Sequence, residues 1–438
     1  MNNYKQRLLK SIPGGAHTYS RGYDQFPEIV PDIFIKGKGA YLYDDKGVSH
    51  LDYGMSLRAV HLGYAEDTVD QAAFSQISNG NNLTKPSLVE LEAAELLIDL
   101  IDSVDMVKFT KNGSTAVSAA VKLSRAYTGR DKVVRCSDQP FLSYDDWFIS
   151  STPITKGIPQ SSLNNTLKFR YNDIAGLENI IAQEGDTIAC VVMEPSSLEH
   201  PIASASHIGE TFLHDVKRLC QKHGIVFVLD EMITGFRWHL NGAQAYYGIT
   251  ADLCTFGKAM ANGFSVAAVG GKREIMELGS IEFLGQERVF LLSTTHGAEM
   301  SGLGAFIGTM EFMRENDVVK HLWEYGGELK RLVNSVVSSH GLSEYIVMDG
   351  IDCSPFFVTN DLSKDPSLPF RTLLVQEMFK NGVLMPWIAL SFRHGDRELE
   401  LTANALDSAC KVYKKALEGG WQDYLIGNPI KPVFRRFN

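Results

Sequence analysis

The sequence predicts an α/β protein with a largely parallel central sheet in a large domain and a second, smaller α+β domain. Strand and helix patterns alternate from about residue 106 to 271, which is the order found in doubly wound sheets. Residues 225–229 are five consecutive apolar residues, as expected of a parallel strand covered on both faces. Beyond about residue 310 the chain changes to helices, short strands and a long amphipathic helix. We therefore expect a large domain at 66–310 and a small domain at 311–438, which the segment 1–65 joins.

Composition and charge favour small-molecule partners. The 438 residues are 44% hydrophobic and 21% charged, and a net charge of -10 without a sustained basic patch argues against a nucleic-acid surface. No apolar run reaches the length of a signal peptide or a membrane span, so we expect a cytoplasmic protein without a membrane partner. Six scattered cysteines, with no close pair and no histidine at zinc spacing, predict reduced core thiols and no metal site.

The N-terminal part of the chain predicts accessory structure and then a helix. Residues 13–21 are rich in glycine and lack periodicity, which predicts a loop. Residues 33–53 contain short alternating runs around glycine turns, which predicts a small antiparallel sheet. Ser87 and Glu90 form a capping box that opens a helix, and we expect its buried stripe to run from Leu91 to Ile98.

A strand at 106–110 is followed by a glycine-containing turn and a helix that continues to Gly129. Such a turn directs free backbone N–H groups and the positive end of the helix dipole at one point, so it suits an anion. Gly113 would let a phosphate approach closely, and Ser114 or Thr115 would add a hydroxyl group. The alternative is that Ser114 only caps the helix.

The next segments contain aromatic and irregular stretches. Residues 140–148, which include Phe141, are dense in rings that could stack on a flat cofactor, although buried aromatic side chains are more often part of the core. The irregular stretch 152–166 has the length of a lid or a subunit contact. A strand at 188–193 then ends in Glu194.

Two charged residues that follow apolar strands are the leading functional candidates. Asp230 ends the strand at 225–229, at the carboxyl edge where ligands bind in α/β sheets. Lys258 lies between Phe256 and Met260, so its ammonium must find a partner, reach water or lose its proton. A lysine held partly neutral forms Schiff bases. For either residue alone, a structural ion pair or a solvated side chain remains the alternative.

One cofactor would use all of these features together. Pyridoxal 5′-phosphate needs a lysine for its aldehyde, a carboxylate for its pyridine nitrogen, an anion site for its phosphate and a partner for its flat ring. Lys258, Asp230, the turn at Gly113 and the aromatic segment 140–148 match these four requirements. The sequence therefore predicts a pyridoxal-phosphate enzyme.

Segments 111–116, 230–237 and 252–258 resemble the class III pyridoxal-phosphate aminotransferases, and most closely the glutamate-1-semialdehyde 2,1-aminomutases among them. The resemblance runs from about residue 12 to 402, with its motifs in the family order. It implies fold type I and a homodimer whose active sites lie at the subunit interface.

The resemblance also implies roles for individual residues. Lys258 would carry the cofactor and transfer protons, Asp230 would bind the ring nitrogen, and Met232 would pack on the ring. Thr294, with Thr295 beside it, would reach the phosphate from the neighbouring subunit. The complete set of expected cofactor-binding residues is Gly113, Ser114, Thr115, Phe141, Glu194, Asp230, Met232, Lys258, Thr294 and Thr295.

The substrate half departs from the aminomutase pattern. Phe141 follows a proline where the family has a Tyr-His pair, so it would stack on the ring or line the substrate pocket. Trp387 lies where a glutamate is expected, whereas Arg21 matches the arginine that takes a substrate carboxylate. The expected substrate residues are Tyr19, Arg21, His296 and Trp387.

This combination predicts an aminotransferase that moves an amino group from an amino donor to an aldehyde or ketone of a small polar metabolite, with a carbohydrate derivative as one candidate. The leading alternative is the aminomutase, which transfers the amino group within one molecule and which Arg21 supports. Decarboxylation or racemisation would use the same lysine and aspartate. A binding protein without catalysis is disfavoured, because both residues are present.

Overall fold

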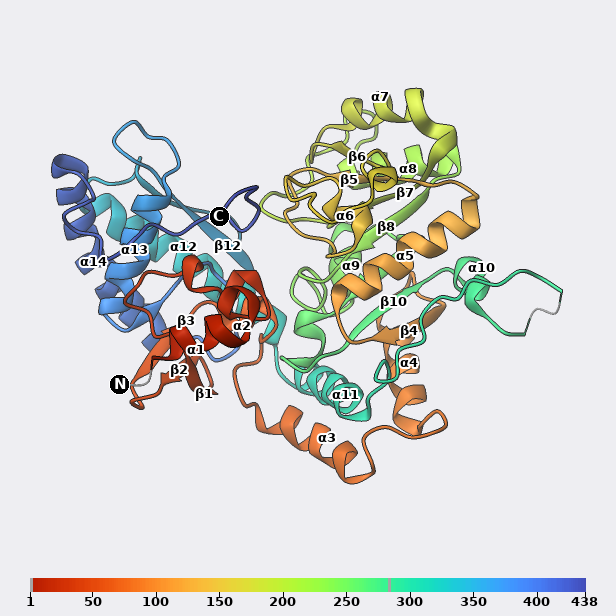
Figure 1. Ribbon diagram of the computed structural model, residues 1–438, viewed down its shortest axis with the longest axis horizontal. Helices are drawn as coiled ribbons and strands as arrows, with labels where there is room; N and C mark the ends of the chain where they lie inside the picture. The colour runs from red at the N-terminus through yellow and green to blue at the C-terminus, as the bar shows by residue number, and fades with distance from the viewer. Residues whose placement is uncertain (1–2, 283–284) are drawn as a thin grey trace. The chain divides into compact units, whose positions relative to one another are not determined.

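The computed structural model describes residues 3–282 and 285–438, and the chain forms two compact units (Figure 1). The terminal unit consists of Met1–Glu66 and Lys320–Arg435, and the central unit consists of Asp67–Val319 and Arg436–Asn438. The terminal unit is therefore built from two segments that are far apart in the sequence, and the residues between them form most of the central unit.

The central unit contains a mixed sheet in which parallel pairs predominate. Its strands are β4 (Met106–Thr110), β5 (Lys132–Cys136), β6 (Thr166–Phe169), β7 (Ile188–Met193), β8 (Val226–Asp230), β9 (Leu253–Phe256) and β10 (Ala267–Gly271). They lie in the order β4-β10-β9-β8-β7-β5-β6. Only β10 pairs in an antiparallel manner, with β9 and β4. The predicted α/β class and largely parallel sheet are confirmed.

Helices accompany the strands of this sheet along the chain. They are α3 (Asp67–Ser78), α4 (Leu88–Leu100), α5 (Gly113–Thr128), α6 (Asp146–Ile149), α7 (Ile174–Glu184), α8 (Phe212–His223), α9 (Gly242–Tyr247), α10 (Arg273–Met276) and α11 (Met300–Glu315). In Figure 1, α3 and α11 lie side by side. Gly304 and Gly308 permit this approach, because a Cβ at either position would lie 2.8 Å from an atom of Ala72.

The predicted capping box of α4 is present, but of the predicted stripe Leu91, Ala94, Leu97 and Ile98 only Leu97 is buried. Ser87 and Glu90 bond reciprocally at the start of the helix. The buried residues are Val89, Ala93, Leu97 and Leu100, whereas Leu91 is 55% exposed. Apolar residues lie on more than one side of this helix, so its spacing fits two stripes and only packing selects one.

The terminal unit is an α+β structure. Its strands are β1 (Phe34–Lys38), β2 (Tyr41–Asp44), β3 (Ser49–Asp52), β11 (Ile346–Ile351), β12 (Ser354–Thr359) and β13 (Val383–Leu384). Its helices are α1 (Tyr4–Ser11), α2 (Met55–Arg58), α12 (Val318–Ser339, which begins in the central unit), α13 (Leu368–Lys380) and α14 (Asp396–Gly419). The expected antiparallel sheet is formed by β1, β2 and β3, and β13 adds a parallel strand to it. The segment predicted as a loop at 13–21 instead contains two 3₁₀ turns, at Pro13–Gly15 and Tyr19–Arg21.

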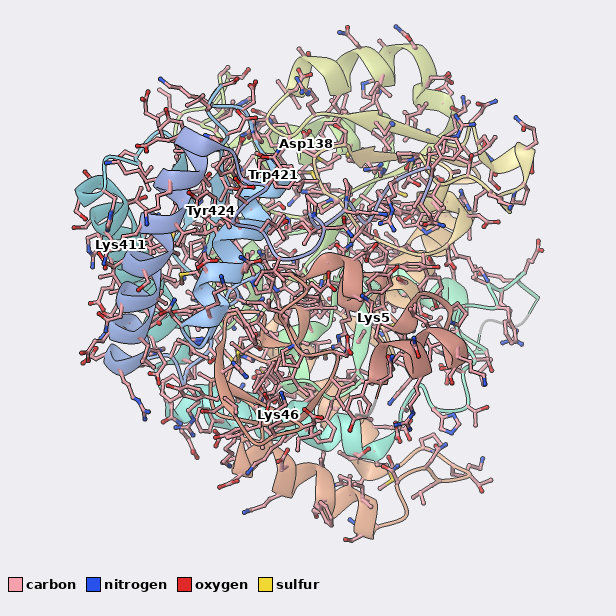
Figure 2. The ribbon with its side chains drawn as sticks, turned by 60° about the vertical axis from the view of Figure 1, so that its left-hand side comes forward. Lys5, Lys46, Asp138, Lys411, Trp421 and Tyr424 are labelled. Carbon is pink, nitrogen blue, oxygen red and sulfur yellow. The ribbon has the colours of Figure 1, made fainter. Side chains whose placement is uncertain are left out.

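The long helix α14 shows the amphipathic pattern expected from its sequence. Thr402, Leu406, Cys410 and Tyr413 lie on its buried face. Lys411 extends from the exposed face, where its ammonium lies 2.6 Å from the Asp407 carboxylate (Figure 2).

Across residues 3–282 and 285–438, no helix combines the length and the apolar character needed to cross a membrane. The same residues contain no cluster of three or more histidine, cysteine, aspartate or glutamate side chains suited to a metal ion.

Candidate active site

Asp230 and Lys258 are delivered by neighbouring parallel strands. Asp230 is the last residue of β8 and pairs in register with Thr255 of β9. The Thr255 hydroxyl donates a hydrogen bond of 3.0 Å to Asp230 Oδ1. Lys258 follows three residues after Thr255 and two residues beyond the end of β9. Because parallel strands end at the same edge of a sheet, the acid and the lysine belong to one region of the central unit.

The Asp230 carboxyl is a buried acid whose ionisation is opposed by burial. It is 2% exposed. Burial raises its pKa to about 6, although the Lys258 ammonium and hydrogen bonds from the Met232 N–H and the Thr255 hydroxyl act to lower that pKa. A protonated ring nitrogen would supply a charge-assisted partner for this carboxylate. The carboxyl therefore fits the nitrogen of a pyridine cofactor.

Lys258 lies in an unusual backbone conformation. Its φ is +42°, in the left-handed region, and it opens the 3₁₀ turn Lys258–Ala261. Asn262, which ends the turn, has a φ of +43°. A non-glycine residue in this region is strained, and such strain concentrates at functional sites because the surrounding structure must hold it. The backbone that carries the Lys258 side chain is thus held in a constrained conformation.

Met232 connects the lysine turn with the predicted phosphate turn. A Cβ at Gly113 would lie 2.7 Å from Met232 Sδ, and a Cβ at Gly257 would lie 2.6 Å from the same sulfur atom. Both positions therefore require glycine while the Met232 side chain stays in place. The Met232 side chain is 6% exposed. The structure brings Gly113, Met232 and the residue before Lys258 into direct contact.

The N-terminus of α5 retains free donors for an anion. Asn112 caps the helix by accepting the Thr115 N–H at 2.9 Å. The alternative that Ser114 is the cap is therefore wrong, and its hydroxyl instead accepts the Tyr144 N–H at 3.2 Å. The N–H groups of Gly113 and Ser114 lie in the first helical turn, where no carbonyl of the same helix can accept them. This end of α5 fits a phosphate.

Phe141 and Glu194 lie in contrasting surroundings. Phe141 is 47% exposed and meets Phe148 edge to face at 5.8 Å between ring centroids. Trp147 and Phe148 of the same segment are buried, which is the core alternative for aromatic side chains. Glu194 is 3% exposed, and its backbone N–H and C=O are both bonded to the side-chain amide of Gln139. The Phe141 ring is accessible to a ligand, whereas Glu194 is held inside the unit.

Thr294, Thr295 and His296 are exposed residues of one turn. The Gly297 N–H donates to the Thr294 carbonyl at 3.1 Å, and the Asn82 amide donates to the Thr295 carbonyl at 3.0 Å. The turn is followed by Glu299, which pairs with Lys111 beside the α5 N-terminus. The Lys111–Glu299 pair was not expected from the sequence, because ion pairs between residues so far apart in the chain leave no local pattern.

Arg21 and Trp387 line a cavity of about 970 Å³ in the terminal unit. The Arg21 guanidinium donates through Nη2 to the Ser56 hydroxyl at 2.8 Å. The Trp387 indole donates to the Gly54 carbonyl at 3.0 Å. Tyr19 is 72% exposed and packs near Gly14. Two of the predicted substrate residues thus share one cavity, whereas His296 belongs to the central unit.

Comparison with known proteins identifies the family. Residues 18–350 match the family model described as aminotransferase class-III. The chain belongs to this family. It is therefore a pyridoxal-phosphate enzyme of fold type I, as the sequence predicted.

Individual relatives are similar to this chain over almost its whole length. A glutamate-1-semialdehyde 2,1-aminomutase from Methanobrevibacter smithii is 29% identical over an alignment of 433 positions, which covers 94% of this chain and 98% of that protein. The FumI protein of Sphingopyxis sp. MTA144, in its PLP internal aldimine form, has a TM-score of 0.84 and 25% identity over 95% of this chain and 97% of its own. An omega-transaminase from Sphaerobacter thermophilus has a TM-score of 0.81 and 26% identity over 94% and 97%.

Proposed function

We propose that this class III enzyme is an aminotransferase, which moves an amino group from an amino donor to an aldehyde or ketone of a small polar metabolite. A carbohydrate-derived acceptor is the first class to test. The observation that carries the proposal is the composition of the cavity in the terminal unit, where Arg21 lies with Trp387 in place of the glutamate expected in an aminomutase. An arginine there suits a carboxylate on one substrate.

The cofactor residues take the following roles in this proposal. Lys258 would hold the cofactor, and it would then remove the proton from the substrate carbon that bears nitrogen and pass that proton to the cofactor carbon. Asp230 keeps the ring nitrogen protonated, because a buried carboxylate beside it favours the charged form. Bound pyridoxal phosphate supplies an electrophilic carbon and an electron-withdrawing ring. Gly113 and Ser114 hold its phosphate, and Met232 packs on the ring.

The remaining expected residues complete the site. Thr115 and Glu194 support the phosphate turn and the ring pocket, and Phe141 offers an accessible ring for stacking or for the substrate. His296 and Tyr19, which are both exposed, contact substrate in this proposal.

We also propose a homodimer in which Thr294, with Thr295 beside it, reaches the phosphate of the neighbouring subunit. The support is a set of exposed apolar side chains on α3, on α4 and between them, namely Phe74, Ile77, Leu83, Leu88 and Leu91. Apolar groups gathered in this way are typical of protein interfaces. Light scattering of the purified enzyme tests the assembly, and a monomer would contradict it. A cytoplasmic location is part of the proposal, and it is supported by the six buried cysteines, which form no disulfide bond.

The second candidate function is glutamate-1-semialdehyde 2,1-aminomutase. The Methanobrevibacter smithii relative favours it, because that protein has this name and matches nearly end to end. Arg21 is compatible with both functions.

One experiment separates these functions. An aminotransferase loses its visible cofactor absorbance when an amino donor is added alone, and a keto acid or aldehyde restores it after the donor is removed. We expect this cycle with at least one donor from a panel of amino acids and amines. Conversion of glutamate-1-semialdehyde to 5-aminolevulinate without a second substrate would instead establish the aminomutase.

A further inference from the structure

The short element α2, which follows β3, is a turn with a backbone conformation that its residues rarely adopt. Met55, Ser56, Leu57 and Arg58 have φ angles of 37°, 50°, 59° and 69°. These four residues form one left-handed turn, and none of them is glycine. Left-handed helical geometry brings Cβ close to the next carbonyl oxygen, so it is normally visited by single residues. The surrounding structure must therefore compensate for the strain of this turn.

Asp52 is the principal anchor of the turn. Its buried carboxylate accepts the N–H of Gly54 at 2.7 Å and the N–H of Met55 at 2.9 Å. It also accepts the hydroxyl of Tyr64 at 2.7 Å. One side chain thus fixes the start of the turn and connects it to the strand that precedes it.

Packing fixes the turn on a second side. Met55 is buried in a cluster with Val60 and Ala389, against which Tyr64 and Trp387 pack. The end of the turn is held from outside the cavity, because Arg58 donates to the Ser354 hydroxyl at 3.0 Å. The anchored turn therefore cannot relax to an ordinary right-handed turn without breaking contacts at both ends.

The turn presents its middle residues to the cavity. Ser56 and Leu57 line the cavity together with Arg21, Tyr64 and Trp387. The Ser56 hydroxyl accepts a hydrogen bond from Arg21 Nη2 at 2.8 Å. A guanidinium has five N–H donors, so this bond restricts its orientation and still leaves donors for a carboxylate. Arg21 is itself exposed, and it would otherwise sample many rotamers.

We propose that the left-handed turn 55–58 determines the enzyme's selectivity for substrates that carry a carboxylate, because Ser56 orients the guanidinium of Arg21. Asp52 is a positioning residue, which acts on substrate only by holding the turn. The inference rests on the proposed function, since it takes Arg21 as the carboxylate partner. The new element is Ser56, which we expect to make the enzyme favour a carboxylate-bearing donor over a plain amine.

The test compares matched donors in the first half of the reaction. Holoenzyme is mixed with L-glutamate, L-alanine or β-alanine, which carry a carboxylate, and with isopropylamine or 1-phenylethylamine, which do not. The second-order rate constant for loss of the visible cofactor absorbance is measured for each donor. The variants are Ser56→Ala, Asp52→Asn and Arg21→Ala. The control is Ser354→Ala, which removes the other hydroxyl bonded to this turn and lies outside the cavity lining.

Ser56→Ala should lower the rate constants of the carboxylate donors about tenfold and leave those of the plain amines unchanged. The loss should appear as a raised donor concentration at half-saturation with little change in the limiting rate. Asp52→Asn should shift selectivity in the same direction, and Ser354→Ala should not. If Asp52→Asn does not fold, Ser56→Ala alone decides, because it removes only one half-buried hydroxyl.

The outcomes distinguish the two levels of the proposal. Equal losses on both donor classes, or no loss on either, in Ser56→Ala would overturn this inference. If Arg21→Ala lowers the rate constants of the carboxylate donors selectively while Ser56→Ala leaves those of both donor classes unchanged, the inference fails and the proposed function stands. If no donor reduces the absorbance of the wild-type enzyme, the proposed function fails, and this inference fails with it.

Discussion

Replacing Asp230 by asparagine separates the cost of a buried charge from its catalytic use. Asparagine retains an oxygen that can accept the hydrogen bonds of the Met232 N–H and the Thr255 hydroxyl, both of which reach Oδ1. It cannot ionise. The substitution therefore removes the charge and little else, so any pH-dependent change in stability reports the carboxylate itself.

The expected size follows from the pKa of the buried acid. In the folded chain without cofactor the Asp230 pKa is raised from 3.8 to about 6, with burial as the main cause. At about 1.36 kcal/mol per pH unit, this difference corresponds to roughly 3 kcal/mol. Because the folded state binds the proton more tightly than the unfolded state, wild-type stability falls as pH rises from 3.8 to about 6 and is level above that range.

The variant lacks this dependence. The free energy of unfolding of cofactor-free Asp230→Asn, relative to wild type, should rise by roughly 3 kcal/mol between acidic pH and pH 8, and about half of that rise should fall between pH 5 and pH 8. Urea unfolding of both cofactor-free proteins at pH 5, 6, 7 and 8 measures it. A difference that stays constant over this range would refute the reasoning.

With cofactor bound, wild type should be the more stable of the two proteins. Bound cofactor offers Asp230 a charged partner, so pyridoxal phosphate should stabilise wild type far more than the variant. If Asp230 has the proposed role, turnover of the variant should fall by orders of magnitude, because Asp230 is the only residue of β8 that can ionise. An unchanged rate would mean that another group has this role.

Three further predictions concern single residues. Lys258→Ala should abolish turnover while the protein still binds cofactor without a covalent bond, as absorbance and turnover assays will show; retained turnover would exclude Lys258 as the proton carrier. Gly113→Ala should weaken cofactor affinity at least tenfold, because its Cβ would lie 2.7 Å from Met232 Sδ, whereas Gly419→Ala, with no atom within 4 Å, should bind normally in the same titration. Ala65→Gly should raise the free energy of unfolding by about 1 kcal/mol, because Ala65 has a φ of +51° that favours glycine, and a lower urea midpoint would contradict this.

The sequence predicted the strands and helices of the central unit better than it predicted which strands pair with one another. The run at β8 and the capping box at α4 are local signals, and both are present. The insertion of antiparallel β10 between β4 and β9 depends on contacts between distant segments. The short edge strand β6 was missed, because its four residues follow directly on an irregular stretch.

The candidate site shows the same limit. Asp230, Lys258 and Gly113 could be singled out because each has a charge or a conformational freedom at the end of a strand pattern. The position of Met232 between two glycines could not, since it depends on how three loops pack. Asn112 rather than Ser114 caps α5, and neighbouring residues that can all cap a helix leave that choice to the backbone.

The left-handed turn at 55–58 had no signal in the sequence. Met-Ser-Leu-Arg contains no glycine, and residues of these types ordinarily avoid positive φ. Its conformation is imposed by Asp52 and by the packing of Met55. Strain of this kind becomes visible only when the tertiary structure is known.

The attachment point of the cofactor is the most direct test of the central claim. Borohydride reduction of the holoenzyme makes the bond between cofactor and lysine permanent, and mass spectrometry of the digested protein then locates the pyridoxyl group. We predict that the group is found on Lys258 and on no other lysine. A modified peptide from elsewhere in the chain, or a reduced holoenzyme without a pyridoxyl group, would contradict the account.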